Sequence, residues 1–213
     1  MTLDRLVIIG AGDHGRVVAD LARAAGWEPV GFVEPDGAAE DNTRAPAGLT
    51  VIGSLEQPDA WRSSATAFTV ALGDNRARRS AWEACLALGL VPLRLVHPTA
   101  SLLGGSVVED GAQVCAGAVI GVDARVMGDA IVNTAATVDH DGVVGPHAQV
   151  GPGSHLAGRV TIGEGAFLGT GAIVVPGRSI GAWSLVAAGA TVIHDVPDGA
   201  RVGGVPARPL DDS

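Results

Sequence analysis

Aromatic residues and positive charge are scarce in this chain of 213 residues. Phe and Trp make up 3% of it and Tyr is absent, which suits a slim aliphatic interior, and the 31 glycines suit a repeat domain with many tight corners. Lys and Arg together number 14 against 23 Asp and Glu, for a formal net charge of −9. Nucleic acid and anionic membranes are therefore not expected as partners, because both bind through clustered cations.

Cysteines and long apolar runs are also too few for several other protein classes. Cys85 and Cys115 cannot make a disulfide framework and suit a reducing compartment. No stretch approaches the roughly 18 uninterrupted apolar residues of a membrane span. The opening MTLDRLVIIG carries an acidic residue where a secretory signal needs basic charge. We therefore expect a soluble, cytoplasmic protein.

The strongest pattern present is an aliphatic residue at every sixth position from Leu102 to Val192. A small residue follows four places after most of these positions, with Val160 and Arg178 as the exceptions. A period of six fits neither a helix nor a simple strand alternation. It is typical of a β-solenoid, in which each hexad forms a short strand and a corner, and three hexads form one coil of about 18 residues. We expect the aliphatic side chains to point inward and to stack from coil to coil.

The first 97 residues follow a different pattern, in which strands and helices alternate. The expected strands cover residues 6–12, 29–34, 50–53, 68–73 and 92–98, and the expected helices lie near 17–26 and at 78–89. Residues 35–48 are expected to form a loop, and the Pro- and Gly-rich tail from Asp195 is expected to be irregular. The sequence thus predicts a small Rossmann-like α/β domain at 1–97, followed by an all-β solenoid domain at 98–213 that ends in a tail.

A glycine-rich turn links the first expected strand to the first expected helix. Gly10-Ala11-Gly12-Asp13-His14-Gly15 fits G-x-G-x-x-G, and Glu34 follows some 20 residues later. Backbone N–H groups at such a helix start can hold a phosphate. A nucleotide-linked ligand, a nicotinamide cofactor and a purely structural turn remain open, although the domain is small for a dinucleotide. Glu34 either accepts hydrogen bonds from a ribose or base, or is a solvated strand end.

Within the solenoid, residues 133–141 are the stretch densest in polar chemistry. His140 follows Asp139 and precedes Asp141, and a carboxylate that orients an imidazole can make it a general base. The alternative is an exposed histidine in an acidic turn. A zinc site made of His140, His147 and His155 is not expected, because spacings of 7 and 8 residues do not stack imidazoles on coils of 18. Cys115 as a nucleophile lacks a basic neighbour in the repeat.

Several motifs together carry a family resemblance. They are GAGDHGRVVAD, GFVEPD, ALGDNRARR, LVHPTA, VNTAATVDHD, GPGSHLAG, VTIGEGAFLGTGA and GVPAR. With them the chain resembles bacterial sugar acyltransferases of the hexapeptide-repeat class, and in particular nucleotide-sugar N-acetyltransferases of the bacillosamine and perosamine type, with sialic-acid O-acetyltransferases as near relatives. The resemblance implies a left-handed parallel β-helix, a homotrimer, acetyl-coenzyme A in a groove between subunits, and a nucleotide sugar held by the α/β domain.

The resemblance also implies roles for single residues. His140 matches the general base and Asp141 its supporting acid, and the Gly158 N–H matches the group that faces the thioester carbonyl. The remaining matches are Thr170 and Ala188 in the pantetheine groove, Ala11, Gly12 and Asp13 in the phosphate-binding turn, Gly73 and Arg76 near the nucleotide, and Asn133 facing the sugar. No metal is implied.

Two positions depart from the family pattern. Gln149 stands near the coenzyme, where many relatives have a second histidine, and it can donate a hydrogen bond but cannot carry a proton at neutral pH. Glu34-Pro35 replaces a pair of aspartates at the end of the second strand. The identity of the nucleotide therefore stays open.

The function expected from the sequence is direct acetyl transfer from acetyl-coenzyme A to the amine of a nucleotide-linked 4-amino-4,6-dideoxy sugar, in the biosynthesis of a surface glycan. O-acetylation of sialic acid or a related nonulosonic acid is the alternative that uses the same base. A binding or scaffolding solenoid without catalysis is the alternative from another class, and the intact Asp139-His140-Asp141 run argues against it.

Overall fold

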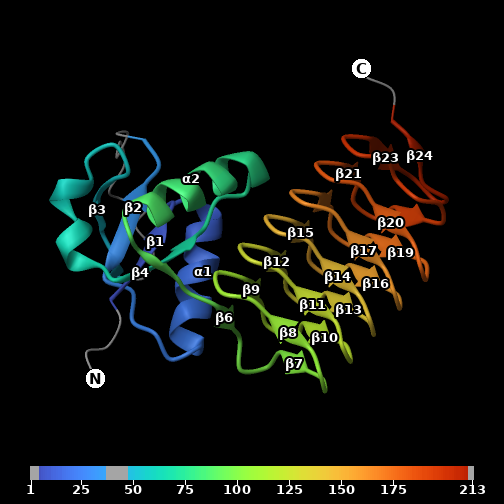
Figure 1. Cartoon of the computed structure of the whole chain (residues 1–213), viewed down its shortest axis with the longest axis horizontal. Helices are drawn as coiled ribbons and strands as arrows, with labels where there is room; N and C mark the ends of the chain where they lie inside the picture. Colours follow the sequence, from blue (N-terminus) through green and yellow to red (C-terminus); the bar gives the residue numbers. More distant parts are fainter. Residues whose placement is uncertain (1–4, 37–47, 211–213) are drawn as a thin grey trace. The chain divides into compact units, whose positions relative to one another are not determined.

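The computed structural model describes residues 5–36 and 48–210 (Figure 1). The chain divides into two compact units, Met1–Leu95 and Val96–Ser213, which are described separately. Most of the loop expected at 35–48 lies outside the described residues. No helix in the described part of the chain is long and apolar enough to cross a membrane.

The first unit is built on a parallel five-stranded sheet with the order β3-β2-β1-β4-β5. Its elements are β1 (Leu6–Ile9), α1 (Asp13–Ala24), β2 (Gly31–Glu34), β3 (Val51–Ser54), the 3-10 helices η3 (Pro58–Ala60) and η4 (Arg62–Ser64), β4 (Ala67–Val70), α2 (Asn75–Ala87) and β5 (Val91–Pro92). All four residues of β1 are buried, as expected for a central strand covered on both faces. The expected alternation of strands and helices is therefore present.

Several boundaries differ from the sequence prediction by a few residues, and two of the differences have a clear physical reason. Helix α2 begins at Asn75 rather than Arg78, because the Asp74 carboxylate caps it by accepting hydrogen bonds from the Arg76 and Ala77 N–H groups at 2.9 and 2.8 Å. The single strand expected at 92–98 is two strands in different sheets. β5 pairs with β4, whereas β6 (Leu95–Val96) lies next to β9 (Gln113–Val114) in a sheet of the solenoid.

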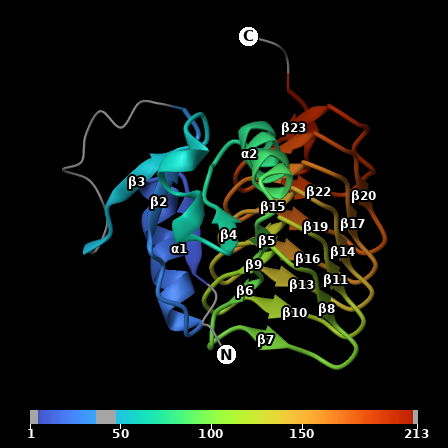
Figure 2. The ribbon, with the colours of Figure 1, turned by 60° about the vertical axis from the view of Figure 1, so that its left-hand side comes forward.

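The second unit is a parallel β-helix whose walls are three sheets (Figure 2). Its two-residue strands are β7 (Ser101–Leu102), β8 (Val107–Val108), β9 (Gln113–Val114), β10 (Val119–Ile120), β11 (Arg125–Val126), β12 (Ile131–Val132), β13 (Thr137–Val138), β14 (Val143–Val144), β15 (Gln149–Val150), β16 (His155–Leu156), β17 (Thr161–Ile162), β18 (Phe167–Leu168), β19 (Ile173–Val174), β20 (Ser179–Ile180), β21 (Leu185–Val186) and β22 (Thr191–Val192). The register of Val138 on Leu156 shows the 18-residue coil directly.

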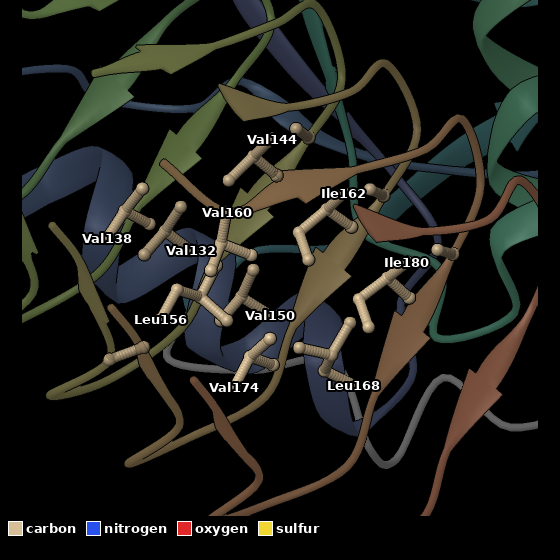
Figure 3. Packing of buried hydrophobic residues seen from close by; sticks show 14 of the residues in the cluster. Val132, Val138, Val144, Val150, Leu156, Val160, Ile162, Leu168, Val174 and Ile180 are labelled. Atoms are coloured by element: carbon tan, nitrogen blue, oxygen red, sulfur yellow. The ribbon is translucent and has the colours of Figure 1, made fainter. Parts of the chain in front are cut away.

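The second residue of each strand from β7 to β22 is a hexad position, and these side chains form the core (Figure 3). Val138, Val150 and Leu168 are fully buried, and burying each such side chain stabilises the fold by about 1.5–3 kcal/mol. Val160, one of the two exceptions to the small-residue pattern, also points into this core. Leu102 is 45% exposed, because β7 is the end strand of its sheet and has a neighbouring coil on one side only.

Every coil turns three corners, and every sixth residue from Gly105 to Gly189 has a left-handed backbone there. The N–H of this residue donates to a carbonyl at the same corner of the preceding coil, as Asp141 does to Val122 at 3.0 Å and Arg159 to His140 at 2.9 Å. We name three stacks of corners by one residue each. They are the His140 corner (122–123, 140–141, 158–159, 176–177), the His147 corner (128–129, 146–147, 164–165, 182–183) and the Thr170 corner (134–135, 152–153, 170–171, 188–189).

The segment after Asp195 is more regular than expected. β23 (Arg201–Gly203) adds to β21 in parallel, and β24 (Arg208–Pro209) pairs with β23 in an antiparallel sense. The expectation of an irregular tail was wrong. Leu185 pairs with Arg201 only 16 residues later, so this coil is shorter than the others and the six-residue pattern does not detect it.

Candidate active site

The turn between β1 and α1 is built closely around two glycines. Gly10 has a φ of 101° and donates its N–H to the Val33 carbonyl at 2.8 Å, and a side chain there would come within 2.7 Å of Leu72. A side chain at Gly15 would overlap the Gly10 carbonyl. Helix α1 starts directly after Gly12, without a capping side chain. Its first N–H groups are therefore open to an anionic ligand.

The six residues expected to bind the nucleotide sugar in this unit lie at one edge of its sheet. Ala11, Gly12 and Asp13 follow β1, Glu34 ends β2, and Gly73 and Arg76 follow β4. Because these three strands are adjacent and parallel, their carboxyl ends meet at the same edge. From β1 the chain adds β2 and β3 on one side of the sheet and then β4 and β5 on the other side. α/β sheets typically bind ligands at such a switch point, here between β1 and β4.

Glu34 contacts the glycine turn itself. Its half-buried carboxylate accepts a hydrogen bond from the Ala11 N–H. Burial raises the pKa of Glu34 above its ordinary value, the Ala11 donor opposes this rise, and nearby Asp36 adds to it. The N-terminus of α2 is already occupied by Asp74. Of the two helix starts at this edge, that of α1 is thus the one left open.

In the solenoid, His140 and Asp141 form a hydrogen-bonded pair at the His140 corner. The His140 Nδ1 lies 2.8 Å from the Asp141 Oδ2, and the two side chains are 46% and 55% exposed. Asp139 accepts the His140 backbone N–H at 2.7 Å and so fixes the corner from the other side. The structure thus gives an exposed imidazole that is oriented by a carboxylate, within the acidic turn that the sequence indicated.

Gly158 lies one coil further along the same corner, directly against the His140 ring. A Cβ at Gly158 would overlap the ring, with Nε2 as the nearest atom. The first residue of several other corners is Pro146, Pro152 or Pro176, which has no N–H to satisfy. The N–H of Gly158 has no hydrogen-bond partner among the described residues. A free backbone donor therefore lies beside the imidazole Nε2.

A groove of about 310 Å³ runs over the outer face of β10, β13, β16 and β19 and reaches this corner. Val119 and Ile173 are among its apolar lining residues. Its polar groups include Asp139, next to His140, and the pair formed by His155 Nδ1 and Thr137 Oγ1 at 3.0 Å. This groove was not expected from the sequence, although Thr137 and His155 are one 18-residue coil apart and therefore lie side by side on neighbouring strands.

The other solenoid residues expected to bind ligands lie at or next to the Thr170 corner. Thr170 and Ala188 stack there on successive coils. Asn133 directly follows β12 and Gln149 lies in β15, and both strands lead into this corner. Asn133 uses its Oδ1 to accept the Thr134 N–H at 2.8 Å. Within one chain the expected ligand-binding residues of the solenoid are therefore divided between two corners, with the sheet that contains β13 between them.

The three solenoid histidines have three different partners. His140 binds Asp141, His155 binds Thr137, and His147 Nδ1 lies 2.8 Å from the buried Asp129 Oδ2 at the His147 corner. Among the described residues no three His, Cys, Asp or Glu side chains converge on a point where a metal ion could bind. Burial raises the pKa of the Cys115 thiol to about 11, which disfavours a thiolate nucleophile there.

A hexapeptide solenoid with an oriented histidine at a corner is the architecture of a hexapeptide-repeat transferase. Two family models match the chain. They are the PglD N-terminal domain over residues 5–84 and the bacterial transferase hexapeptide (six repeats) over residues 141–175. A search of curated proteins gives no match.

Solved structures similar to the chain agree with these matches. A variant of perosamine N-acetyltransferase from Caulobacter crescentus, in complex with CoA and GDP-perosamine, is 38% identical with a TM-score of 0.91 over 99% of both chains. The acetyltransferase domain of PglB from Neisseria gonorrhoeae, in complex with acetyl coenzyme A, is 38% identical with a TM-score of 0.87 over 97% of this chain and 99% of that one. WeeI from Acinetobacter baumannii, 24% identical with a TM-score of 0.85 over 97% of this chain and 99% of that one, shares the fold.

The chain therefore belongs to the bacterial hexapeptide-repeat sugar acyltransferases of the PglD and perosamine N-acetyltransferase type. The expected fold class, a Rossmann-like α/β domain followed by a left-handed parallel β-helix, is confirmed. The chain is an acyltransferase, as expected.

Proposed function

We propose that the chain transfers the acetyl group of acetyl-CoA to the amine of a nucleotide-linked 4-amino-4,6-dideoxy sugar for the synthesis of a surface glycan. The observation that carries this proposal is the His140 corner, where an oriented imidazole and a free backbone N–H lie side by side. The relative from C. crescentus binds CoA and GDP-perosamine, and the domain from N. gonorrhoeae binds acetyl coenzyme A. Acetyl-CoA is the co-substrate of the reaction.

His140 is the general base in this proposal, and Asp141 sets its tautomer. An ionised carboxylate only accepts hydrogen bonds, so the ring proton lies on Nδ1, which donates to Asp141 Oδ2. The lone pair of Nε2 is then free on the side of the ring that faces Gly158. This is the atom that takes the proton, and such a group accelerates the reaction by roughly 10²- to 10⁴-fold.

Transfer proceeds directly, without an acyl-enzyme. The neutral sugar amine attacks the thioester carbonyl, the new C–N bond forms, and the carbonyl oxygen becomes an oxyanion that accepts the Gly158 N–H. His140 Nε2 takes the proton that the nitrogen loses. The C–S bond then breaks, the imidazolium returns the proton to the leaving sulfur, and free CoA and the amide are the products. Each turnover restores His140 to its starting state.

The nucleotide part of the substrate is assigned to the α/β unit. The open N-terminus of α1 offers its N–H groups to the diphosphate through Ala11, Gly12 and Asp13. Gly73 and Arg76, after the neighbouring strand β4, stand at the same edge. Glu34 is available to a ribose or base N–H once its bond to Ala11 is exchanged. We propose the nucleotide-sugar role for residues 1–97 and the acyl-transfer role for 98–213.

A homotrimer completes the coenzyme site in this proposal. His140 and Gly158 lie at one corner of the coils, whereas Thr170 and Ala188 lie at another, so one chain does not place all four together. If three subunits pack their β-helices side by side, the His140 corner of one subunit lies against the Thr170 corner of the next, with Gln149 and Asn133 nearby. Sedimentation of the purified protein as a trimer supports this arrangement, and a monomer that is fully active contradicts it.

A substrate screen tests the proposed function most directly. The protein is incubated with acetyl-CoA and nucleotide-linked 4-amino-4,6-dideoxy sugars, and mass spectrometry records the gain of one acetyl group. His140→Asn serves as the inactive control, and His194→Asn, an exposed histidine outside the site, as the matched active one. Calorimetric titration with UDP, GDP and dTDP identifies the nucleotide. Acetylation of free sialic acid, together with no nucleotide binding, would establish the O-acetyltransferase alternative instead.

A further inference from the structure

Three carboxylates lie at or next to the His140 corner and disfavour an anionic group of the substrate there. Asp139 and Asp141 contact His140 itself, and Asp123 occupies the same corner one coil earlier, where its carboxylate lies against Gly105. The diphosphate of a nucleotide sugar is itself negative, and at a separation of a few ångströms each like-charged pair costs on the order of 1 kcal/mol even in water. A cation beside these carboxylates would offset this repulsion for a substrate whose amine reaches His140.

Arg159 is the cation that the fold places there. The chain has no lysine, so all 14 of its basic side chains are arginines. Arg159 is the one arginine among the left-handed corner residues of the described solenoid. Its backbone N–H donates to the His140 carbonyl at 2.9 Å, which fixes it on the coil next to the His140–Asp141 pair. It also follows directly after Gly158, the proposed oxyanion donor.

The position of Arg159 matches that of Asp141 one coil earlier. Both residues occupy the third place after a hexad position, and both have a φ close to 60°. Asp141 uses this backbone to bring its carboxylate to His140. The Arg159 side chain starts from the equivalent point, so it leaves the corner beside the same pair and not toward the core. It is exposed, as Asp141 is.

The Arg159 guanidinium has no hydrogen-bond or ion-pair partner in the described part of the chain. Within the ranges that the structure describes, no carboxylate lies at ion-pair distance from it, whereas Arg178, one coil further on, lies 3.7 Å from Asp195. An arginine held at a corner beside a reacting group, and not consumed by an internal ion pair, is suited to bind a ligand phosphate.

We infer that Arg159 binds the sugar-linked phosphate of the nucleotide sugar while the amine of that sugar is at His140. This inference rests on the proposed function and deepens it. In a 4-amino sugar the amine and the phosphate are separated by one pyranose ring, so a side chain next to the reacting amine reaches the phosphate. The phosphates of CoA lie at the far end of the pantetheine arm from the thioester and are out of its reach. Arg159 is thus a binding residue that favours phosphate-linked acceptors over free sugars.

Replacement of Arg159 by Asn tests this inference. Asn tolerates the left-handed backbone, so the corner is expected to fold. Loss of a charge-assisted hydrogen bond should raise the KM for the nucleotide sugar about ten- to a hundredfold. The KM for acetyl-CoA should stay within about twofold of the wild-type value, since no CoA phosphate is contacted. Arg125→Gln, which removes one exposed cation from β11 on a neighbouring sheet, is the matched control and should leave both constants unchanged.

A second substrate separates phosphate binding from other roles. With the methyl glycoside of the same amino sugar, which has no phosphate, wild type and Arg159→Asn should have equal kcat/KM. A defect that is equal on both substrates, a rise in the KM for acetyl-CoA, or a fall in kcat alone would overturn the inference and leave the proposed function standing. If the wild-type protein acetylates no nucleotide-linked amino sugar, the proposed function fails, and this inference fails with it.

Discussion

Two corners of the solenoid carry histidine–aspartate pairs with the same 2.8 Å separation, and they differ in almost everything else. In the pair of His140 and Asp141, both side chains are about half exposed. In the pair of His147 and Asp129, the imidazole is 12% exposed and the carboxylate is fully buried. The first pair joins neighbours in one coil, and the second joins two successive coils.

The difference shows that a short hydrogen bond does not by itself identify a reacting group. In the proposed mechanism His140 exchanges a proton with the substrate, and its ring packs against Gly158, where a side chain would overlap it and where the backbone N–H has no partner among the described residues. His147 instead supplies a partner to a carboxylate that water cannot reach. We therefore expect changes at the first pair to affect turnover and changes at the second to affect stability.

The largest effect is expected for His140→Ala. Removal of the proposed base should lower kcat by roughly 10²- to 10⁴-fold. The unfolding free energy should change by no more than about 0.5 kcal/mol, because the side chain is on the surface. Steady-state kinetics and urea unfolding on the same preparation measure both. A variant with near-normal turnover would show that proton transfer does not depend on this imidazole.

The reverse outcome is expected for His147→Ala. The change deprives the fully buried Asp129 of its imidazole partner, and the unfolding free energy should fall by about 1–3 kcal/mol, the cost of removing one partner of a buried hydrogen bond. At a temperature where the variant is still folded, kcat should remain near the wild-type value. If kcat falls as far as in His140→Ala while stability is unchanged, the two pairs have been assigned the wrong way round.

A smaller effect, on turnover alone, is expected for Gly158→Ala. The new methyl group would displace the His140 ring and obstruct the free N–H, so kcat should fall by roughly 10²-fold. Gly104 holds the equivalent place at the start of the solenoid, and a side chain there meets open space. Gly104→Ala is therefore the matched control and should be as active as wild type. Equal activity of both variants would argue against close approach of ligand and ring at Gly158.

The smallest effect is expected for the pH dependence of stability that Glu34 causes. This carboxylate of the α/β unit is half-buried, so it lies between the exposed Asp141 and the buried Asp129. Burial raises its pKa, so the folded state binds the proton more tightly than the unfolded state does. Its contribution to stability is then complete below the unfolded pKa and is lost as pH rises through the folded pKa. Relative to Glu34→Gln, the wild-type unfolding free energy should decline as the pH rises through and above the ordinary pKa of a glutamate side chain. Urea unfolding at several pH values measures this difference, and parallel curves would contradict the expected shift.

The six-residue pattern was enough to predict the solenoid and its core. The side chain at each hexad position points into the interior of the solenoid, and Val138 and Leu168 are buried for that reason. The same pattern also predicts which residues of neighbouring coils meet, although these contacts were not expected from the sequence. Gly158 and His140, His155 and Thr137, and His147 and Asp129 are each separated by one coil of 18 residues, and each pair meets in space.

Other features could not be obtained from spacing. The division of residues 92–98 between two sheets depends on which strand each half pairs with, and both halves are apolar. The exposure that separates His140 from His147 depends on what covers each corner. In the α/β unit the glycine pattern located the turn, but the hydrogen bond from Ala11 to Glu34 and the capping by Asp74 required the folded chain.

The 18-residue register that neighbouring coils keep from β7 to β22 has a consequence for how such a chain can change in length. Deletion or duplication of one whole coil leaves every remaining side chain on the same side of the wall, whereas a shift by one residue would turn the interior outward. Unequal recombination in multiples of a coil is thus a conservative event for this half of the protein. The pairing of His140 with Gly158 spans only two adjacent coils, so turns beyond them can be gained or lost while that pairing is preserved.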